Sequence, residues 1–278
     1  MNYNHKPRGL YERYFKRLFD IVLSLLAIVI LSGLLIIVAI LVRIFLGSPV
    51  LFKQERPGKH AKTFKVYKFR TMLDPQTRDG RKITDNERQE AILKGHVLDV
   101  LSDEERLTKF GRFLRATSLD ELPELFNILG GTMSIVGPRP LLKINVGYYT
   151  PEEDRRHDVL PGLTGLAQIH GRTAVSFETR FRYDVQYVDN VTFWNDLSIV
   201  VKTFLVVFAC KDVAQGVDDV EPFTVTRQRQ LAQIAGITSD EVTKLPIEER
   251  NKLLVKLQEL QHADRAKEAE ARNAQAEA

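Results

Sequence analysis

The hydrophobic and polar positions divide the chain into one long apolar run followed by segments of mixed character. Residues 21–42 read IVLSLLAIVILSGLLIIVAILV and contain no charged side chain. As a helix this run would be about 33 Å long at 1.5 Å per residue, which is enough to cross the hydrocarbon core of a bilayer. It is longer than the apolar part of a signal peptide, and Arg43 follows it in place of a small-residue cleavage site. The pattern therefore predicts a membrane segment that the protein retains.

Basic residues flank this run on both sides. Five Lys and Arg residues lie between positions 6 and 17, and eight lie between positions 43 and 70. Because positive flanks favour the cytoplasmic side of a membrane, both ends favour the same side. Ser32 and Gly33, near the middle of the run, are residues that permit a helix to bend. Two topologies remain open from the residues alone: a helix that enters and returns, and a straight transmembrane anchor.

The segment after the run alternates apolar and basic residues. Residues 50–72 read VLFKQERPGKHAKTFKVYKFRTM, with a turn signal at Pro57-Gly58, and this predicts a short β-hairpin. Its basic face suits either a phosphate group or anionic lipid headgroups. Residues 74–106 are polar with scattered apolar positions, which predicts a loop with a helix and no assigned chemistry.

Residues 107–142 contain two short helices separated by an acidic pair. An apolar stripe breaks near Thr117-Ser118, and Pro123 opens a second helix that ends at Gly130-Gly131. Asp120 and Glu121 fall at the junction, where a helix N-terminus favours ionised carboxylates suited to metal binding or nucleophilic chemistry. The Ser118-x-x-Glu121 spacing is more often that of a capping box, which satisfies backbone donors without catalysis. Pro123 weighs against that interpretation, because it would lie inside a helix begun at Ser118.

Two turn-rich segments follow. Residues 136–140 read VGPRP, a rigid bend that holds Arg139, whose planar guanidinium suits bidentate phosphate recognition. In residues 155–175, Gly162, Gly165 and Gly171 would permit close approach of the backbone to a ligand, and Arg172 is the most suggestive side chain. The common nucleotide-loop, zincin and hydrolase signatures are absent.

The C-terminal part of the chain predicts helices. Residues 195–208 read NDLSIVVKTFLVVF, which is too short and too interrupted by Lys202 to cross a membrane, so a core helix or an interfacial helix is expected. A helix-start signal at Ser239 precedes helically spaced apolar residues from 247 to 260. Residues 262–278 have no apolar face and predict a solvated or frayed helix, with self-association or partner binding left open.

Composition and charge narrow the classes of protein. With 44% hydrophobic and 27% charged residues, the chain can form a folded core. Cys210 is the only cysteine, which excludes an internal disulfide and a multi-cysteine zinc site. The first 72 residues carry 13 Lys and Arg against three acidic residues, whereas the remainder is net acidic. A basic N-terminal quarter suits nucleic acid, anionic lipid or a phosphate-bearing substrate.

Residues 16–226 resemble the bacterial sugar transferases, monotopic polyprenyl-phosphate phosphoglycosyl transferases. The resemblance rests on long motifs in the family's order: KRLFD, GSPVLFKQERPG, FKVYKFRTM, SLDELPELFNIL, MSIVGPRPLL, RHDVLPGLTGLAQIHGR and YDVQYVDN. It implies an α+β, mainly helical fold, with a re-entrant membrane helix, a small cytoplasmic catalytic domain and interfacial helices. The expected divisions are a basic segment (1–20), the membrane helix (21–46), the catalytic domain (47–226) and a helical tail (227–278). The expected location is the cytoplasmic face of the bacterial inner membrane.

The resemblance also implies a reaction. A sugar 1-phosphate would pass from a UDP-sugar to polyprenyl (undecaprenyl) phosphate, with loss of UMP, as the first membrane step of exopolysaccharide or glycoconjugate synthesis. Asp120 would be the nucleophile and a Mg²⁺ ligand, and Glu121 its helper. Phosphate would be held by Arg139, with Lys68, Arg70 and Arg115 as further candidates, and the nucleotide sugar by Arg172. The implied partners are these substrates and membrane lipid, with no nucleic acid.

The chain departs from the family pattern at several positions. A Ser-Gly pair at 32–33 replaces the usual Ser-Pro, and Thr132 replaces an acidic residue. Leu166, His170 and Thr173 stand at varied places of the GLAQIHGRT motif. Thr132 and the added tail motivate one alternative, a catalytically inactive membrane-bound scaffold of the same fold.

Overall fold

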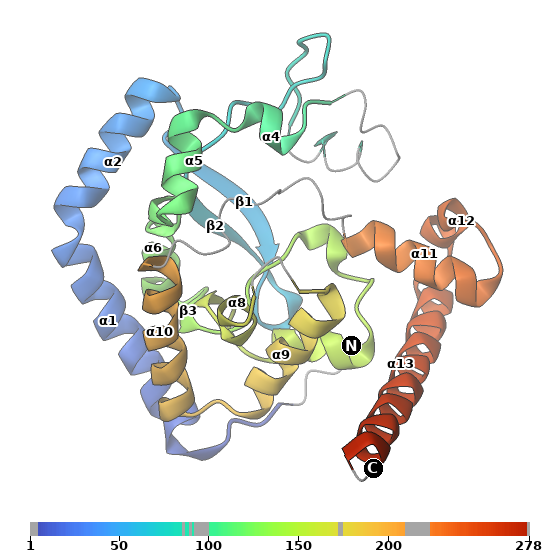
Figure 1. Ribbon diagram of the computed structural model, residues 1–278. Helices are drawn as coiled ribbons and strands as arrows, with labels where there is room; N and C mark the ends of the chain where they lie inside the picture. The colour runs from blue at the N-terminus through green and yellow to red at the C-terminus, as the bar shows by residue number, and fades with distance from the viewer. Residues whose placement is uncertain are drawn as a thin grey trace.

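The computed structural model describes residues 5–84, 87–88, 91, 100–171, 175–208 and 223–276. These residues form a mainly helical α+β fold with two small sheets (Figure 1). The strands are β1 (Leu51–Pro57), β2 (Thr63–Phe69), β3 (Ser134–Val136) and β4 (Gly162–Thr164). The α-helices are α1 (Lys16–Ile30), α2 (Ser32–Phe45), α4 (Asp103–Arg106), α5 (Lys109–Ala116), α6 (Glu124–Leu129), α7 (Pro151–Asp154), α8 (Leu166–Ile169), α9 (Phe177–Asp189), α10 (Phe193–Phe208), α11 (Phe223–Ala235), α12 (Ser239–Lys244) and α13 (Ile247–Ala276).

The long apolar run forms two helices, α1 and α2, which meet at a bend of 65°. In Figure 1 they curve along one side of the molecule. The break lies at Leu31, and the neighbouring Ser32 hydroxyl donates to the Val29 carbonyl at 2.8 Å. Among the described helices, none is by itself long and apolar enough to cross a membrane, although this bent pair satisfies length and composition together. Of the two topologies left open by the residues, the bend matches the helix that enters and returns.

Both arms of the bent pair pack against the rest of the domain. Arg17 of α1 donates to the carbonyls of Ile128 and Leu129 at the end of α6. Val42 of α2 is fully buried in a cluster with Leu114 of α5. The outward faces of the two helices are strongly apolar, and α10, which runs beside α1 in Figure 1, exposes a further apolar face. That face comprises Phe193, Trp194, Leu197, Val201, Phe204 and Leu205.

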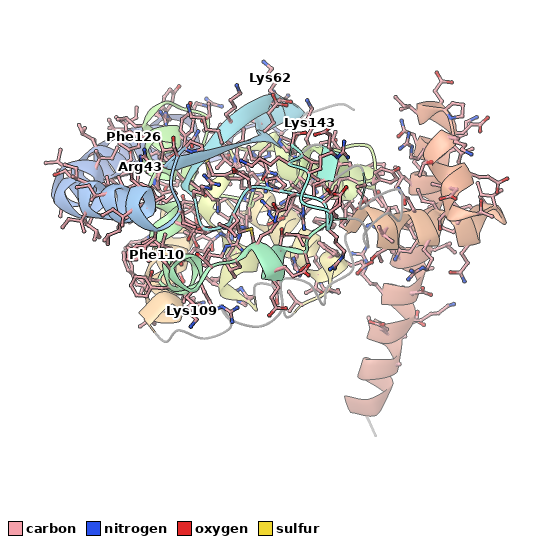
Figure 2. All side chains as sticks on the ribbon, turned by 90° about the horizontal axis from the view of Figure 1, so that it is seen from above. Arg43, Lys62, Lys109, Phe110, Phe126 and Lys143 are labelled. Carbon is pink, nitrogen blue, oxygen red and sulfur yellow. The ribbon has the colours of Figure 1, made fainter. Side chains whose placement is uncertain are left out.

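The predicted hairpin is confirmed. Strands β1 and β2 pair antiparallel, from Leu51 opposite Phe69 to Pro57 opposite Thr63. The tightest part of the turn lies after Pro57-Gly58, because His60 and Ala61 adopt positive φ angles of 55° and 54°. Figure 2 shows Lys62 and Lys143 on the hairpin side of the molecule, and Lys109 and Phe110 on the opposite side.

Strands β3 and β4 form a short parallel pair. The backbone at Gly137, just after β3, lies unusually close to the backbone at the two ends of β4. A Cβ atom on Gly162 would lie 2.1 Å from the Gly137 nitrogen, and one on Gly165 would lie 2.2 Å from the Gly137 oxygen. No side chain fits at such distances. The prediction that Gly162 and Gly165 admit a ligand is therefore wrong, because the protein's own backbone takes that space.

Helices α11 to α13 dock on the remainder of the fold through an aromatic and aliphatic cluster. Phe223 and Leu231 of α11 and Leu254 of α13 are buried there against Tyr149 and Phe181. Thr238 caps α12 in a capping box with Glu241, which confirms the predicted helix start. The far half of α13 is exposed as far as its side chains are described, apart from the half-buried Arg265, which pairs with Glu152, and this agrees with the predicted solvated helix.

Candidate active site

The acidic pair lies on a short turn between α5 and α6. Ser118 adopts a left-handed conformation, with φ of 56°, and stops α5. A single 3₁₀ turn, Leu119–Glu121, then leads into α6. The Ser118 side chain makes no capping hydrogen bond, so the capping-box interpretation is wrong. The Glu121 carboxylate is consequently available for other partners.

Glu121 is held between two cations from distant parts of the chain. Its Oε1 atom accepts hydrogen bonds from Lys68 of β2, at 2.7 Å, and from Arg139 in the bend after β3. Lys68 also lies 3.1 Å from Oε1 of Glu124 in the first turn of α6. Charges of opposite sign thus alternate along the series Arg139, Glu121, Lys68 and Glu124.

Asp120 has a different environment from its neighbour. It is buried, with 7% of its surface exposed, and among the described residues none donates a hydrogen bond to its carboxylate or pairs with it. Burial and the Glu121 charge raise the pKa of Asp120 to about 6, and Lys68, Arg115 and Arg139 oppose that rise. At neutral pH the Asp120 carboxylate is therefore mostly ionised.

The two glutamates titrate in opposite directions. Burial would raise the pKa of Glu121, but Arg139 and Lys68 outweigh it and hold that pKa well below the usual range. Burial dominates at Glu124 and raises its pKa to about 7. Attraction to Glu121 raises the pKa of Arg139, and carboxylates overcome the burial of Lys68, so both cations stay charged. Among the described residues, the site therefore presents fixed positive charge, a Glu121 carboxylate bound by cations and an Asp120 carboxylate without a partner.

The other predicted phosphate ligands divide into two groups. Arg115 donates to Thr71 and acts electrostatically on Asp120, so the structure brings it to the acidic pair together with Lys68 and Arg139. Arg70 is buried and donates instead to the Ser48 and Met72 carbonyls and to Asp74. Its guanidinium therefore holds the loops around the hairpin. Arg172 lies outside the described residues.

Sequence reasoning missed Glu124 and Asn127, which follow the acidic pair at helical spacing. Asn127 accepts from the Tyr67 amide at 2.9 Å and donates to the Lys65 carbonyl at 2.8 Å, and so joins α6 to β2. Thr132, the departure from the family pattern, hydrogen-bonds Asn127. Glu121, Glu124 and Asn127 recur at helical spacing next to the apolar Ile128. This spacing could have indicated that the polar side chains point into the protein.

The carboxylates suit a metal ion only in part. In the described ranges, no three His, Cys, Asp or Glu side chains converge on one point. Mg²⁺ usually takes one or two protein carboxylates and completes its shell with water and substrate phosphates. Asp120, whose oxygens pair with no described residue, meets that requirement, whereas Glu121 is bound by cations. The site therefore fits a Mg²⁺ ion that is shared with a diphosphate substrate.

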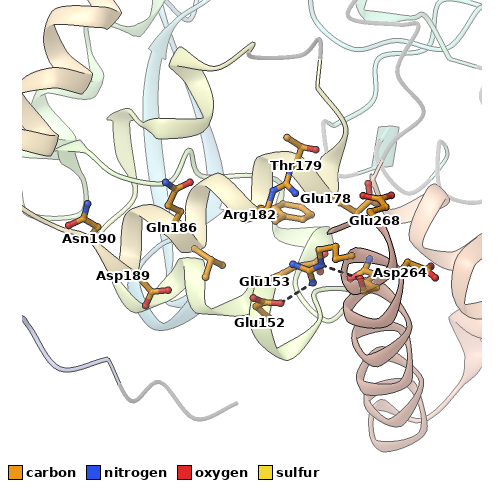
Figure 3. Close-up of a pocket in the computed structure, with 14 residues that line it drawn as sticks. Glu152, Glu153, Glu178, Thr179, Arg182, Gln186, Asp189, Asn190, Asp264 and Glu268 are labelled. Carbon is orange, nitrogen blue, oxygen red and sulfur yellow. Dashed lines mark hydrogen bonds and ion pairs between the residues drawn. The ribbon is translucent and has the colours of Figure 1, made fainter. Parts of the chain in front are cut away.

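A cavity of about 570 Å³ lies elsewhere, between α9 and α13 (Figure 3). Its lining carries six carboxylates and two guanidinium groups, including the Glu152–Arg265 pair drawn in the figure. An anionic diphosphate would be repelled there. The cluster at Asp120 is the better site for phosphate chemistry.

Known proteins are similar to most of this chain. The profile of the family described as bacterial sugar transferase matches residues 11–210. The chain belongs to the bacterial sugar transferase family. It is 44% identical over 200 residues to the uncharacterised sugar transferase EpsL of Bacillus subtilis, covering 72% of this chain and 90% of EpsL.

Two longer relatives carry more specific names. The undecaprenyl-phosphate galactose phosphotransferase of Salmonella typhimurium is 40% identical over 196 residues, which is 70% of this chain and 41% of that protein. The UDP-glucose:undecaprenyl-phosphate glucose-1-phosphate transferase of Klebsiella pneumoniae is 40% identical over 202 residues, which is 70% of this chain and 39% of that protein. This chain thus spans about two fifths of each named enzyme.

Proposed function

We propose that this bacterial sugar transferase moves a sugar 1-phosphate from a UDP-sugar to polyprenyl phosphate and releases UMP. The product would be a polyprenyl diphosphate sugar, the first membrane intermediate of an exopolysaccharide or glycoconjugate. The two named relatives act on galactose and on glucose, so the family name does not select the sugar. The polyprenyl and UDP-sugar assignments rest on the relatives' names together with the phosphate-binding character of the site.

One observation carries the proposal. Asp120 is a buried carboxylate beside cations and pairs with no described residue, while the adjacent Glu121 is held between Lys68 and Arg139. A nucleophile must have a free electron pair and must lie next to groups that neutralise the charge of the phosphate it attacks. Asp120 meets both requirements. Glu121 keeps free electron pairs as well, but the two cations bonded to its Oε1 atom neutralise its charge and make it the weaker nucleophile.

The reaction would proceed in two displacements at phosphorus. In the first, an Asp120 oxygen forms a bond to the β-phosphorus, and the bond from that phosphorus to the bridging oxygen breaks. UMP leaves with the electron pair, and the sugar phosphate remains on Asp120. In the second, a polyprenyl phosphate oxygen attacks the same phosphorus, the bond to Asp120 breaks, and the carboxylate is restored. Splitting the transfer lets one site serve two different substrates in turn.

The cations of the site would stabilise the charge that builds on the transferring oxygens. Arg139 lies at the end of the cluster, with 41% of its side chain exposed, and would offer the diphosphate those N–H groups that pair with no described residue. Lys68 and Arg115 would add positive charge from the protein side. When bound with the substrate, Mg²⁺ held by Asp120 would neutralise further phosphate charge.

We place the bent α1–α2 pair in the membrane as a re-entrant helix. A straight anchor would carry α2 across the bilayer and away from the domain, whereas here α2 packs on α5 through Val42 and Leu114. The exposed apolar face of α10 would lie in the same interface. The basic flanks would then hold the site at the cytoplasmic face.

The first test is UMP release by detergent-solubilised protein with Mg²⁺, polyprenyl phosphate and a panel of UDP-sugars. We expect release with at least one sugar and a loss of more than about 10³-fold in Asp120→Asn, because that change removes the nucleophile. Asp74→Asn, on an exposed loop, is the matched control and should retain at least half the activity. If folded protein releases no UMP with any UDP-sugar of the panel, the result would favour the inactive scaffold.

A further inference from the structure

The bend that carries Arg139 is held at three successive residues, Gly137, Pro138 and Arg139, by one segment, residues 156–164. The bonds run from Gly137 N to Thr164 O (2.9 Å), from Gly162 N to Pro138 O (3.0 Å) and from Arg156 Nη2 to Arg139 O (2.6 Å). The first belongs to the pairing of β3 with β4, in which Val136 lies opposite Thr164. The second ties the bend back to Gly162, which lies opposite Ser134 in that pairing. The third is different in kind, because it comes from a side chain.

The flanking prolines make this third bond important. The ring of Pro140 restricts Arg139 to extended backbone conformations, and Pro140 has no N–H of its own to anchor the chain. The orientation of the peptide group that follows Arg139 therefore depends on what its carbonyl contacts. Arg156 supplies that contact.

Arg156 is itself fixed on all sides. It is 3% exposed, and its guanidinium pairs with Asp184 of α9 at 2.8 Å. It also donates to the Tyr149 hydroxyl at 3.3 Å. A planar, forked guanidinium can make these bonds and the one to Arg139 together, which the single ammonium of a lysine cannot.

An aromatic wall completes the surroundings of Arg156. Its guanidinium carbon lies 5.6 Å from the centre of the Tyr149 ring and 5.4 Å from that of Phe181. Tyr149 stacks on Phe223 of α11 at 5.4 Å, and Phe223 also meets Phe181 edge-on. Phe223 lies beyond residues 11–210, so a helix outside the family match backs this wall.

We infer that Arg156 is a positioning residue that acts through Arg139. By fixing the Arg139 carbonyl, it sets the direction in which the Arg139 side chain reaches Glu121 and the substrate diphosphate. The inference rests on the proposed function. Misplacing a substrate-binding group by about 1 Å can cost about a hundredfold in rate, so a contact outside the site has a measurable effect.

The test is a double-mutant cycle on kcat/KM for the UDP-sugar in the UMP-release assay. Arg156→Lys keeps a cation beside Asp184 but loses the fork. We expect it to lower kcat/KM by about 10-fold to 100-fold, with a rise in KM, and by less than about twofold when Arg139→Lys is already present. Arg155→Lys is the matched control, because Arg155 is the adjacent residue, is partly exposed and pairs with Asp189.

A merely structural role gives a different pattern. Loss of folded protein would make Arg156→Lys lower kcat/KM by the same factor with Arg139 present and with Arg139→Lys present. Equal factors in these two backgrounds would therefore overturn the inference. Thermal unfolding of each variant accompanies the cycle. If Arg156→Lys does not fold, Asp184→Asn, which removes one partner of Arg156, enters the same cycle with the same criterion. An inactive wild-type protein would refute the proposed function, whereas an active one with equal factors would refute only the positioning role.

Discussion

At the scale of single residues, two adjacent carboxylates have opposite surroundings. Glu121 accepts from Lys68 and Arg139, while Asp120 is buried without a partner among the described residues. The sequence predicts the acidic pair and the cations that could serve it. It does not predict which carboxylate each cation contacts, because β2 and the bend after β3 meet the pair only in space.

The pH dependence of the first chemical step should follow Asp120. Its pKa is raised to about 6, so its proton is taken up at a higher pH than in a free aspartate. The ionised form attacks, and kcat/KM for UMP release should therefore fall as the pH drops through about 6. Lys68 lowers the pKa of Asp120, and Lys68→Met should move this fall to higher pH. Lys65→Met, on the exposed side of the same strand, should leave it in place; an unmoved profile in Lys68→Met would contradict the assignment.

At the scale of elements, local sequence patterns predict the helices, strands and turns better than they predict the contacts between them. The hairpin, the break between α5 and α6 and the start of α12 follow from turn and capping residues, and the structure confirms them. The link between α6 and β2 through Asn127 could not be read in this way. A polar residue within an apolar helix shows that a partner is needed, but not which strand provides it.

Asn127 should contribute strongly to stability. Its amide pairs with the Tyr67 N–H and the Lys65 carbonyl, and Asn127→Ala would leave buried polar groups unsatisfied. We expect the free energy of unfolding, measured by urea titration in detergent, to fall by about 2 kcal/mol or more. Asn251→Ala on the exposed side of α13 should change it by less than about 0.5 kcal/mol. Equal changes in the free energy of unfolding of the two variants would show that the Asn127 hydrogen bonds do not stabilise the fold.

At the scale of the whole molecule, the family motifs and their order predict the domain from Lys16 onward. The docking of α11 to α13 was not predictable, because the apolar spacing from 247 to 260 indicates a buried face without naming what covers it. The structure places Tyr149 and Phe181 against it. The largest consequence at this scale concerns topology, since both arms of the bent pair contact the same body.

Labelling of single cysteines tests that topology. In a Cys210→Ser background, Lys6→Cys and Lys53→Cys place one thiol before the bent pair and one after it. A re-entrant helix leaves both on the cytoplasmic side, so a membrane-impermeant maleimide should label neither in intact spheroplasts and both after lysis. Labelling of exactly one position before lysis would show a helix that spans the bilayer.

The central claim is that Asp120 carries the sugar phosphate, and the most direct measurement is the mass of the protein during the first step. Purified protein would be quenched after incubation with Mg²⁺ and its UDP-sugar in the absence of polyprenyl phosphate, and the modified peptide mapped. We predict a sugar phosphate on Asp120, lost on addition of polyprenyl phosphate and absent in Asp120→Asn. UMP release by an enzyme that stays unmodified at every quench time, or an adduct mapped to Glu121, would contradict the account.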